Sequence, residues 1–214
     1  MPALIRFANV RIDFNGVPLF KDLNFNVLPG EKILLYGLSG VGKTTILKAL
    51  LGFQKVDRGS ILFNNQPISK KNIWPFRHQI AYVSQDLDIG DGNVHALIQT
   101  VLNYRINSDT QITKQDIIER LDFLRLKPGI LDKDYAELSG GEKQRIILII
   151  ALLINRPVFL LDEPTAFMDI AIKKKVIEYF INCQATVLTV GHDPLWLDHT
   201  NIKVIDLGVN DANT

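Results

Sequence analysis

A glycine-rich run near residue 40 has the residue types and spacing that hold a phosphate group. Gly37, Gly42, Lys43 and Thr44 fit the pattern GxxxxGK[ST], between an apolar strand pattern and a helical one. Glycines let backbone N–H groups turn towards phosphate oxygens, and a helix N-terminus attracts the anion. Lys43 would neutralise phosphate charge, and the Thr44 hydroxyl would bind Mg²⁺. The predicted nucleotide site comprises Gly37, Leu38, Ser39, Gly40, Val41, Gly42, Lys43, Thr44 and Thr45.

Two adjacent carboxylates end a second apolar run. Asp162 and Glu163 directly follow VFLL, and ligands of α/β proteins bind beyond the carboxyl ends of the strands. We expect Asp162 to hold Mg²⁺. Because successive strand side chains alternate in direction, Glu163 would point elsewhere and could polarise the water that attacks the γ-phosphate.

A third motif, LSGGEKQR at residues 138–145, offers a second anion site. Ser139, Gly140 and Gly141 would place a hydroxyl and backbone N–H groups at a helix start. By itself this pattern is more typical of an ordinary capped helix. His192, which follows a predicted strand, is placed to hydrogen-bond the γ-phosphate. Gln85, after another predicted strand, is placed to reach Mg²⁺ or water.

The elements that must position these residues alternate along the chain. Apolar and β-branched runs bounded by turn residues predict strands. Their ranges are 4–10, 17–20, 23–27, 32–36, 60–63, 79–84, 158–161, 185–190 and 203–206. Apolar periodicity predicts helices over 94–105, 114–126, 139–154 and 169–181, two of them with capping boxes, at Thr113 and Ser139. Lys173, Lys174 and Lys175 would form a solvated helix face.

This order predicts an α/β fold in which a helical segment interrupts a parallel sheet. We expect one domain over residues 1–214. Residues 1–85 and 155–214 would form the nucleotide-binding core with its β subdomain, and residues 86–154 the helical subdomain, or helical lobe.

Composition excludes several classes of protein. The 24 Lys and Arg residues nearly balance the 23 Asp and Glu residues, which argues against a nucleic-acid partner. The longest apolar run, residues 146–154, is far shorter than the roughly 20 residues of a membrane-spanning helix. The N-terminus has no signal-peptide pattern, and lone Cys183 allows no internal disulfide. We expect a cytoplasmic protein or one on the inner face of a membrane.

Together the motifs resemble those of the ATP-binding cassette (ABC) ATPases. LSGGEKQR is similar to the signature motif of that family, and GLSGVGKTT, VFLLDEP and VGHDP occur in the family's order. The resemblance runs from about residue 4 to residue 206. It implies a P-loop NTPase core with a mostly parallel sheet, an N-terminal antiparallel β subdomain and an inserted helical subdomain.

The resemblance also implies roles for single residues. Phe14 matches the aromatic residue that stacks on adenine, although Phe20 is an alternative. Gln85 matches the Q-loop, His192 the switch histidine, and Asp169 the last residue of the D-loop. The D-loop departs from the family, because it reads AFMD where SALD is usual.

A function follows from the resemblance. It implies an ATP-hydrolysing subunit of an ABC transporter, with ATP and Mg²⁺ as cofactors. Two copies, in the simplest case a homodimer, would pair head to tail, so that Ser139, Gly140 and Gly141 meet the nucleotide on the other copy's phosphate loop. A separate membrane-spanning permease would dock between Gln85 and the helical lobe, on the inner face of the cell membrane.

Alternatives remain at this point. Residues 130–149 and the lobe before them resemble the ATP-binding subunit of bacterial iron-export ABC transporters, but an importer would look much the same. A soluble ABC ATPase of an assembly machinery, such as iron–sulfur cluster biogenesis, is the main alternative. A P-loop kinase or GTPase would not explain LSGGEKQR. The interval from Thr44 to Ser139 is too short for the coiled coil of a DNA-repair ABC ATPase.

Overall fold

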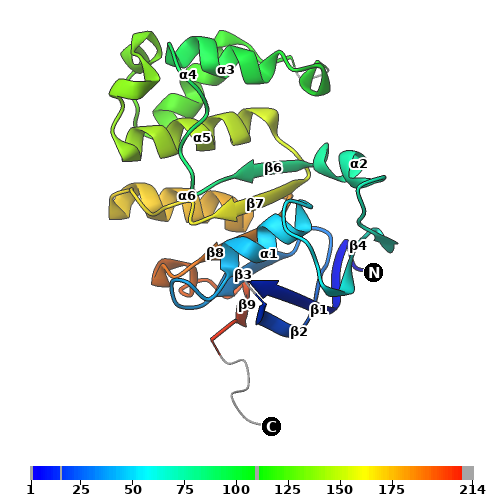
Figure 1. Cartoon of the computed structure of the whole chain (residues 1–214). Coiled ribbons are helices and arrows are strands. Elements are labelled where there is room, and N and C mark those ends of the chain that lie inside the picture. The colour runs from blue at the N-terminus through cyan, green and yellow to red at the C-terminus, as the bar shows by residue number, and fades with distance from the viewer. Residues whose placement is uncertain (1, 15, 109–110, 209–214) are drawn as a thin grey trace.

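The fold consists of two sheets with helices packed around them (Figure 1). The computed structural model describes residues 2–14, 16–108 and 111–208. Within this part of the chain, no helix has both the length and the apolar character needed to cross a bilayer.

The larger sheet has five strands, all parallel, in the order β6-β7-β8-β3-β9. These strands are β6 (Ile80–Val83), β7 (Val158–Asp162), β8 (Thr186–Gly191), β3 (Lys32–Tyr36) and β9 (Lys203–Asp206). Every residue of β7 and β8 is buried, because helices or the second sheet cover both faces. The carboxyl ends of the strands therefore meet at one edge, where the predicted chemistry lies.

The smaller sheet is antiparallel, with the order β2-β1-β4-β5. Its strands are β1 (Ile5–Phe14), β2 (Val17–Val27), β4 (Arg58–Phe63) and β5 (Gln66–Pro67). The prediction of separate strands at 17–20 and 23–27 is wrong. The intervening Lys21 and Asp22 are exposed and continue β2, and irregular pairing with β1 absorbs the break in the apolar pattern.

The parallel sheet separates two apolar cores. Val158 and Leu160 of β7 pack in the core that includes α1 (Lys43–Leu50) and the antiparallel sheet. Phe159 and Leu161 of the same strand pack in the other core, with α5 (Gly140–Ile154) and α6 (Ile170–Asn182). This alternation follows from the two-residue period of a strand.

The helices α3 (Val94–Leu102), α4 (Lys114–Phe123) and α5 lie together above β6 and β7 in Figure 1, and all fall within residues 86–154. The predicted capping boxes at Thr113 and Ser139 are confirmed. Two predicted helix ends are too late. Helix α3 stops at Leu102 and is followed by a 3₁₀ turn, Arg105–Asn107, and α4 stops before Arg125, whose φ is +54°.

The remaining short elements connect these layers. They are α2 (Ile73–Arg77) and the 3₁₀ turns Pro128–Asp132, Tyr135–Glu137 and Pro194–Trp196. The turn before α5 contacts the loop after β6, because the Tyr135 hydroxyl donates a hydrogen bond of 2.5 Å to the carbonyl of Leu87.

Candidate functional site

The glycine-rich run forms a loop between β3 and α1. Gly42 precedes the helix with a φ of +101°, which favours glycine. A Cβ atom there would lie 2.5 Å from Leu19 Cδ2 and 2.9 Å from Phe20 Cε2. Glycine is thus required at this position both by the backbone conformation and by the packing of the antiparallel sheet.

Lys43 lies inside this loop and is only 5% exposed. Its Nζ donates hydrogen bonds to the carbonyls of Gly37, at 2.8 Å, and Leu38, at 2.9 Å. Both acceptors are neutral, so the charge of the ammonium group is available to an anionic ligand.

The structure brings Thr44 to Asp162, which is 1% exposed at the end of β7. Thr44 Oγ1 donates to Asp162 Oδ1 at 3.0 Å, and Tyr82 Oη donates to Asp162 Oδ2 at 3.4 Å. Burial raises the pKa of Asp162, although the hydrogen bond from Thr44 opposes that rise. Burial and the Asp162 charge raise the pKa of Tyr82 to about 12, so its hydroxyl stays a donor. A carboxylate beside a hydroxyl is a hard-oxygen donor set that suits Mg²⁺.

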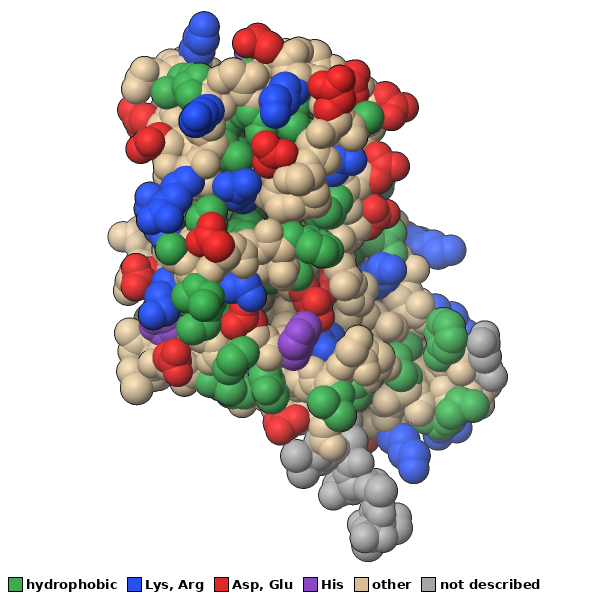
Figure 2. All heavy atoms as spheres, turned by 90° about the vertical axis from the view of Figure 1, so that its left-hand side faces the viewer, with side chains coloured by type: hydrophobic (Ala, Val, Ile, Leu, Met, Phe, Trp, Pro, Cys, Tyr) green, Lys and Arg blue, Asp and Glu red, His purple; other side chains and the backbone are tan. Residues whose placement is uncertain are grey.

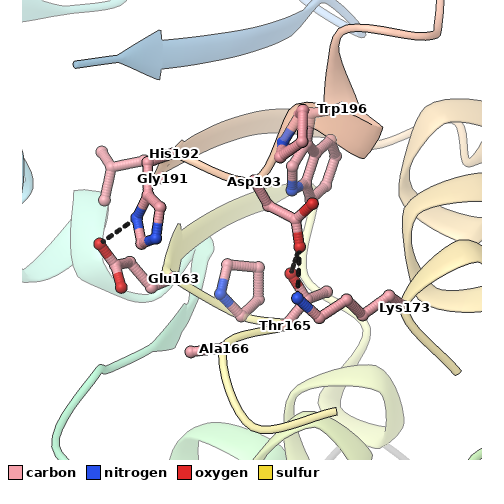
Figure 3. A pocket seen from close by; sticks show the side chains of 11 residues that line it. Glu163, Thr165, Ala166, Lys173, Gly191, His192, Asp193 and Trp196 are labelled. Carbon is pink, nitrogen blue, oxygen red and sulfur yellow. Dashed lines mark hydrogen bonds and ion pairs between the residues drawn. The ribbon is translucent and has the colours of Figure 1, made fainter. Parts of the chain in front are cut away.

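Glu163 and His192 meet next to Asp162. Glu163 Oε1 lies 3.3 Å from His192 Nδ1, as the dashed line in Figure 3 marks. The Glu163 backbone has a φ of +49°, and its N–H donates to the carbonyl of Val190 in β8 at 3.0 Å. The Glu163 side chain is 17% exposed and that of His192 is 63% exposed. A partly buried carboxylate thus faces an accessible imidazole.

Glu163 and His192 both line a cavity of about 260 Å³. Lys173 Nζ contacts Asp193 Oδ2 at 2.7 Å on one side of it, and Thr165 Oγ1 lies 3.4 Å from the same oxygen (Figure 3). The prediction that Lys173 belongs to a solvated helix face is therefore wrong. Helix α6 turns this side chain towards the loop after β8, where it pairs with Asp193. Burial raises the pKa of Asp193, but the Lys173 ammonium and the Leu195 N–H outweigh burial and hold that pKa below its ordinary value.

The ion pair predicts an acid-dependent contribution to stability. We expect Lys173→Met to lower the free energy of unfolding at pH 7 by about 1 kcal/mol. Because the pKa of Asp193 is depressed in the folded state, its contribution is present above the unfolded pKa of about 4 and disappears as pH falls below it. Urea denaturation at pH 7 and at acid pH measures this. Lys174→Met, on the exposed neighbour, is the control, and an equal loss in both variants would contradict the prediction.

The motif LSGGEKQR lies at the start of α5. Ser139 caps the helix, and its hydroxyl donates to Glu142 Oε2 at 2.9 Å. A Cβ atom on Gly141 would lie 2.6 Å from the carbonyl oxygen of Phe167. Since α5 and α1 belong to the cores on opposite faces of the parallel sheet, the two predicted anion sites lie on different sides of it.

The other predicted site residues have distinct surroundings. Phe14 ends β1 and is 62% exposed, whereas Phe20 is 1% exposed and packs near Gly42, so of the two it is Phe14 whose ring is accessible. Gln85 is exposed in the loop after β6. Asp169 caps α6 by accepting a hydrogen bond from the Ile172 N–H at 2.9 Å.

Three further residues that contact the site were not predicted from the sequence. Tyr82 contacts Asp162, Asp193 pairs with Lys173, and Gln144 hydrogen-bonds the backbone of Glu163. Gln144 and Asp193 had a signal in the sequence, since they lie within LSGGEKQR and VGHDP. Tyr82 lies in no motif, and strand order brought it to the site.

In Figure 1, β6 and β7 point to the left, so the edge of the sheet that carries these residues is on the left. Figure 2 shows the molecule from that side. Acidic and basic side chains are intermixed on this face. Fold and site together define a nucleotide-binding α/β protein with a phosphate loop.

Comparison with known proteins identifies the family. The model of the ABC transporter family matches residues 20–166. The chain is 34% identical over 203 residues to the spermidine/putrescine import ATP-binding protein PotA of Mycoplasma mycoides, covering 89% of this chain and 54% of that protein. It is 31% identical over 206 residues to the "Probable ABC transporter ATP-binding protein p29" of Mycoplasma pneumoniae, covering 90% of this chain and 83% of that one.

Solved structures share the fold. A dimeric bacterial ABC transporter cassette is 22% identical with a TM-score of 0.81, and the match covers 95% of each chain. The protein cbiO1 of Clostridium perfringens is 25% identical with a TM-score of 0.73, over 97% of this chain and 86% of that one. The chain therefore belongs to the ABC transporter family and carries its ATPase cassette.

The chain spans only part of some relatives. It covers 54% of PotA and 25% of the mesentericin-Y105 transport/processing ATP-binding protein MesD of Leuconostoc mesenteroides, to which it is 31% identical over 187 residues. The match to MesD covers 83% of this chain.

Proposed function

We propose that this chain binds and hydrolyses ATP with Mg²⁺ and thereby powers transport through a separate membrane-spanning partner. The observation that carries the proposal is the convergence of Lys43, Thr44 and Asp162 with Glu163 and His192 at one edge of the parallel sheet. These residues supply the charge, the metal donors and the base that phosphoryl transfer to water needs.

In this proposal the phosphate loop binds the nucleotide. The N–H groups of residues 37–45 and the Lys43 ammonium bind the phosphates, and Phe14 stacks on adenine. Thr44, Asp162 and Gln85 would hold Mg²⁺, which neutralises charge on the phosphates when bound. Thr44 and Asp162 already lie within 3.0 Å of each other.

Hydrolysis needs a base beside the γ-phosphate. Glu163 would accept a proton from water as the water oxygen bonds to phosphorus, and the bond to ADP breaks. His192 would hydrogen-bond the γ-phosphate and orient the water. Their contact of 3.3 Å supports a shared role at one reacting centre.

We propose further that two copies pair head to tail. The position of α1 and α5 on opposite faces of the sheet supports this, because a signature motif cannot then complete the phosphate loop of its own chain. In the pair, Ser139, Gly140 and Gly141 would contact the nucleotide of the other copy, and Asp169 would lie at the contact between copies. The dimeric cassette with the same fold provides the precedent.

The partner in the membrane would dock between Gln85 and the helical lobe. The names of the relatives support a transporter and differ in cargo, from spermidine/putrescine import to mesentericin-Y105 transport. The similarity therefore supports the shared ATPase part rather than one cargo, and iron export stays a sequence prediction. The intermixed charges of Figure 2 agree with a partner other than nucleic acid.

A pull-down with the Glu163→Gln variant tests the proposed partner. This variant should bind ATP and stay paired, so it should hold its partner from detergent-solubilised membranes of its own cells. We expect a multi-spanning membrane protein, enriched from the membrane fraction and absent when Lys43→Ala is the bait. A partner found only in the soluble fraction would overturn the transporter proposal in favour of an assembly ATPase.

A further inference from the structure

Gln144 is a buried polar residue in the second turn of α5, only 1% exposed. Its Nε2 donates a hydrogen bond of 2.8 Å to the carbonyl of Glu163. Its Oε1 accepts one of 3.0 Å from the N–H of Phe167. The donor and acceptor on the backbone fix which way the amide points. A single side chain of the signature helix thus holds both ends of the loop that follows β7.

That loop contains the proposed base in a strained backbone conformation. A φ of +49° is unfavourable for a residue with a side chain, so it persists only where neighbours hold it. Glu163 is held through its N–H by Val190 of β8, and through its carbonyl by Gln144 and by the Ala166 N–H at 3.2 Å. Gln144 is the contact among these that comes from the helical lobe.

The start of α5 also rests directly on the loop. A Cβ atom on Gly141 would lie 2.6 Å from the carbonyl oxygen of Phe167. A Cβ atom on Gly140 would lie 3.9 Å from the ring of the same phenylalanine. A shift of the first turns of α5 towards the loop would therefore press on Phe167, and a shift in the other direction would stretch the two Gln144 hydrogen bonds. The start of α5 and the loop after β7 are thus joined by two hydrogen bonds and by close packing.

We propose that Gln144 is a positioning residue, which sets the backbone of Glu163 and couples the signature motif of a chain to the base of the same chain. This inference rests on the proposed function of Glu163. An anion bound at Ser139–Gly141 would change the position of the start of α5. Through the Gln144 hydrogen bonds, this would change the orientation of the Glu163 carboxylate relative to the attacking water. A displacement of about 1 Å in a catalytic group can cost about 100-fold in rate.

Three variants test the proposal in the full chain. Gln144→Leu keeps the volume and removes both hydrogen bonds. Gln144→Glu keeps the acceptor for Phe167 and removes the donor when ionised. Gln115→Glu, the same exchange at an exposed position of α4, is the control. We expect Gln144→Leu to lower kcat about 10- to 100-fold with the ATP dissociation constant changed less than twofold.

The pH profile separates positioning from simple loss of stability. Burial would raise the pKa of the introduced carboxyl group. When protonated, that group can donate to the Glu163 carbonyl again; when ionised, it cannot. Relative to wild type at each pH, Gln144→Glu should therefore recover activity as pH falls from 8 to 6, whereas Gln115→Glu should show no such trend.

Amide hydrogen exchange provides a readout that needs no turnover. Peptides covering residues 163–169 should exchange faster in Gln144→Leu than in wild type. In Gln115→Glu, the exchange rate of these peptides should be the same as in wild type. Folded Gln144 variants with kcat within twofold of wild type and unchanged exchange would overturn the proposal, as would weaker ATP binding with unchanged kcat. Wild-type protein that binds no ATP would instead refute the proposed function, while the exchange result still decides whether Gln144 holds the loop.

Discussion

Replacement of Glu163 by glutamine should reduce the rate of ATP hydrolysis by about 10²- to 10⁴-fold and leave the affinity for ATP within about twofold. The amide has the shape of the carboxylate but cannot accept the proton of the attacking water. The substitution leaves Lys43, Thr44 and Asp162 unchanged, and these residues would hold the phosphates and Mg²⁺, so ATP should still bind.

Two measurements test this expectation together. Steady-state phosphate release should collapse, and gel filtration with ATP should show the variant accumulating as a closed dimer. Glu178→Gln, on the exposed face of α6, is the matched control and should behave as wild type. Turnover close to that of wild type in Glu163→Gln would show that Glu163 is not the base.

The second large effect concerns Lys43. We expect Lys43→Ala to weaken ATP binding by about 100-fold or more, because charge-assisted hydrogen bonds to phosphate are each worth about 1.5–3 kcal/mol. The buried ammonium is the cation that the structure places inside the phosphate loop, on the carbonyls of Gly37 and Leu38. Isothermal titration with ATP and Mg²⁺ measures the loss.

The control for this variant lies on the same helix. Lys48→Ala removes an exposed lysine from α1 and should bind ATP within about twofold of wild type. A thermal melt of Lys43→Ala shows whether the fold survives. A folded Lys43→Ala protein that keeps micromolar affinity for ATP would refute the assignment of residues 37–45 to the phosphate site.

Much of the fold follows from local sequence. The strand at 32–36 has the predicted bounds, because its apolar run between turn residues is buried on both faces. The strand at 203–206 also has the predicted bounds, although it is largely exposed at the edge of the sheet. The capping boxes at Thr113 and Ser139 mark helix starts through hydrogen bonds between residues only three positions apart in the sequence. The ends of α3 and α4 were placed too late, because apolar periodicity continues past the residue where the backbone turns.

For the site, the sequence by itself determined the phosphate loop and the signature motif, since each is a contiguous run whose chemistry depends on neighbouring residues. The tertiary structure alone decided how separate segments meet. The contact of Thr44 with Asp162 spans 118 residues, and that of Tyr82 with Asp162 spans 80. Such contacts depend on strand order and on the packing of α5 against the loop after β7. These arise from burial of apolar faces over the whole domain, which no local pattern encodes.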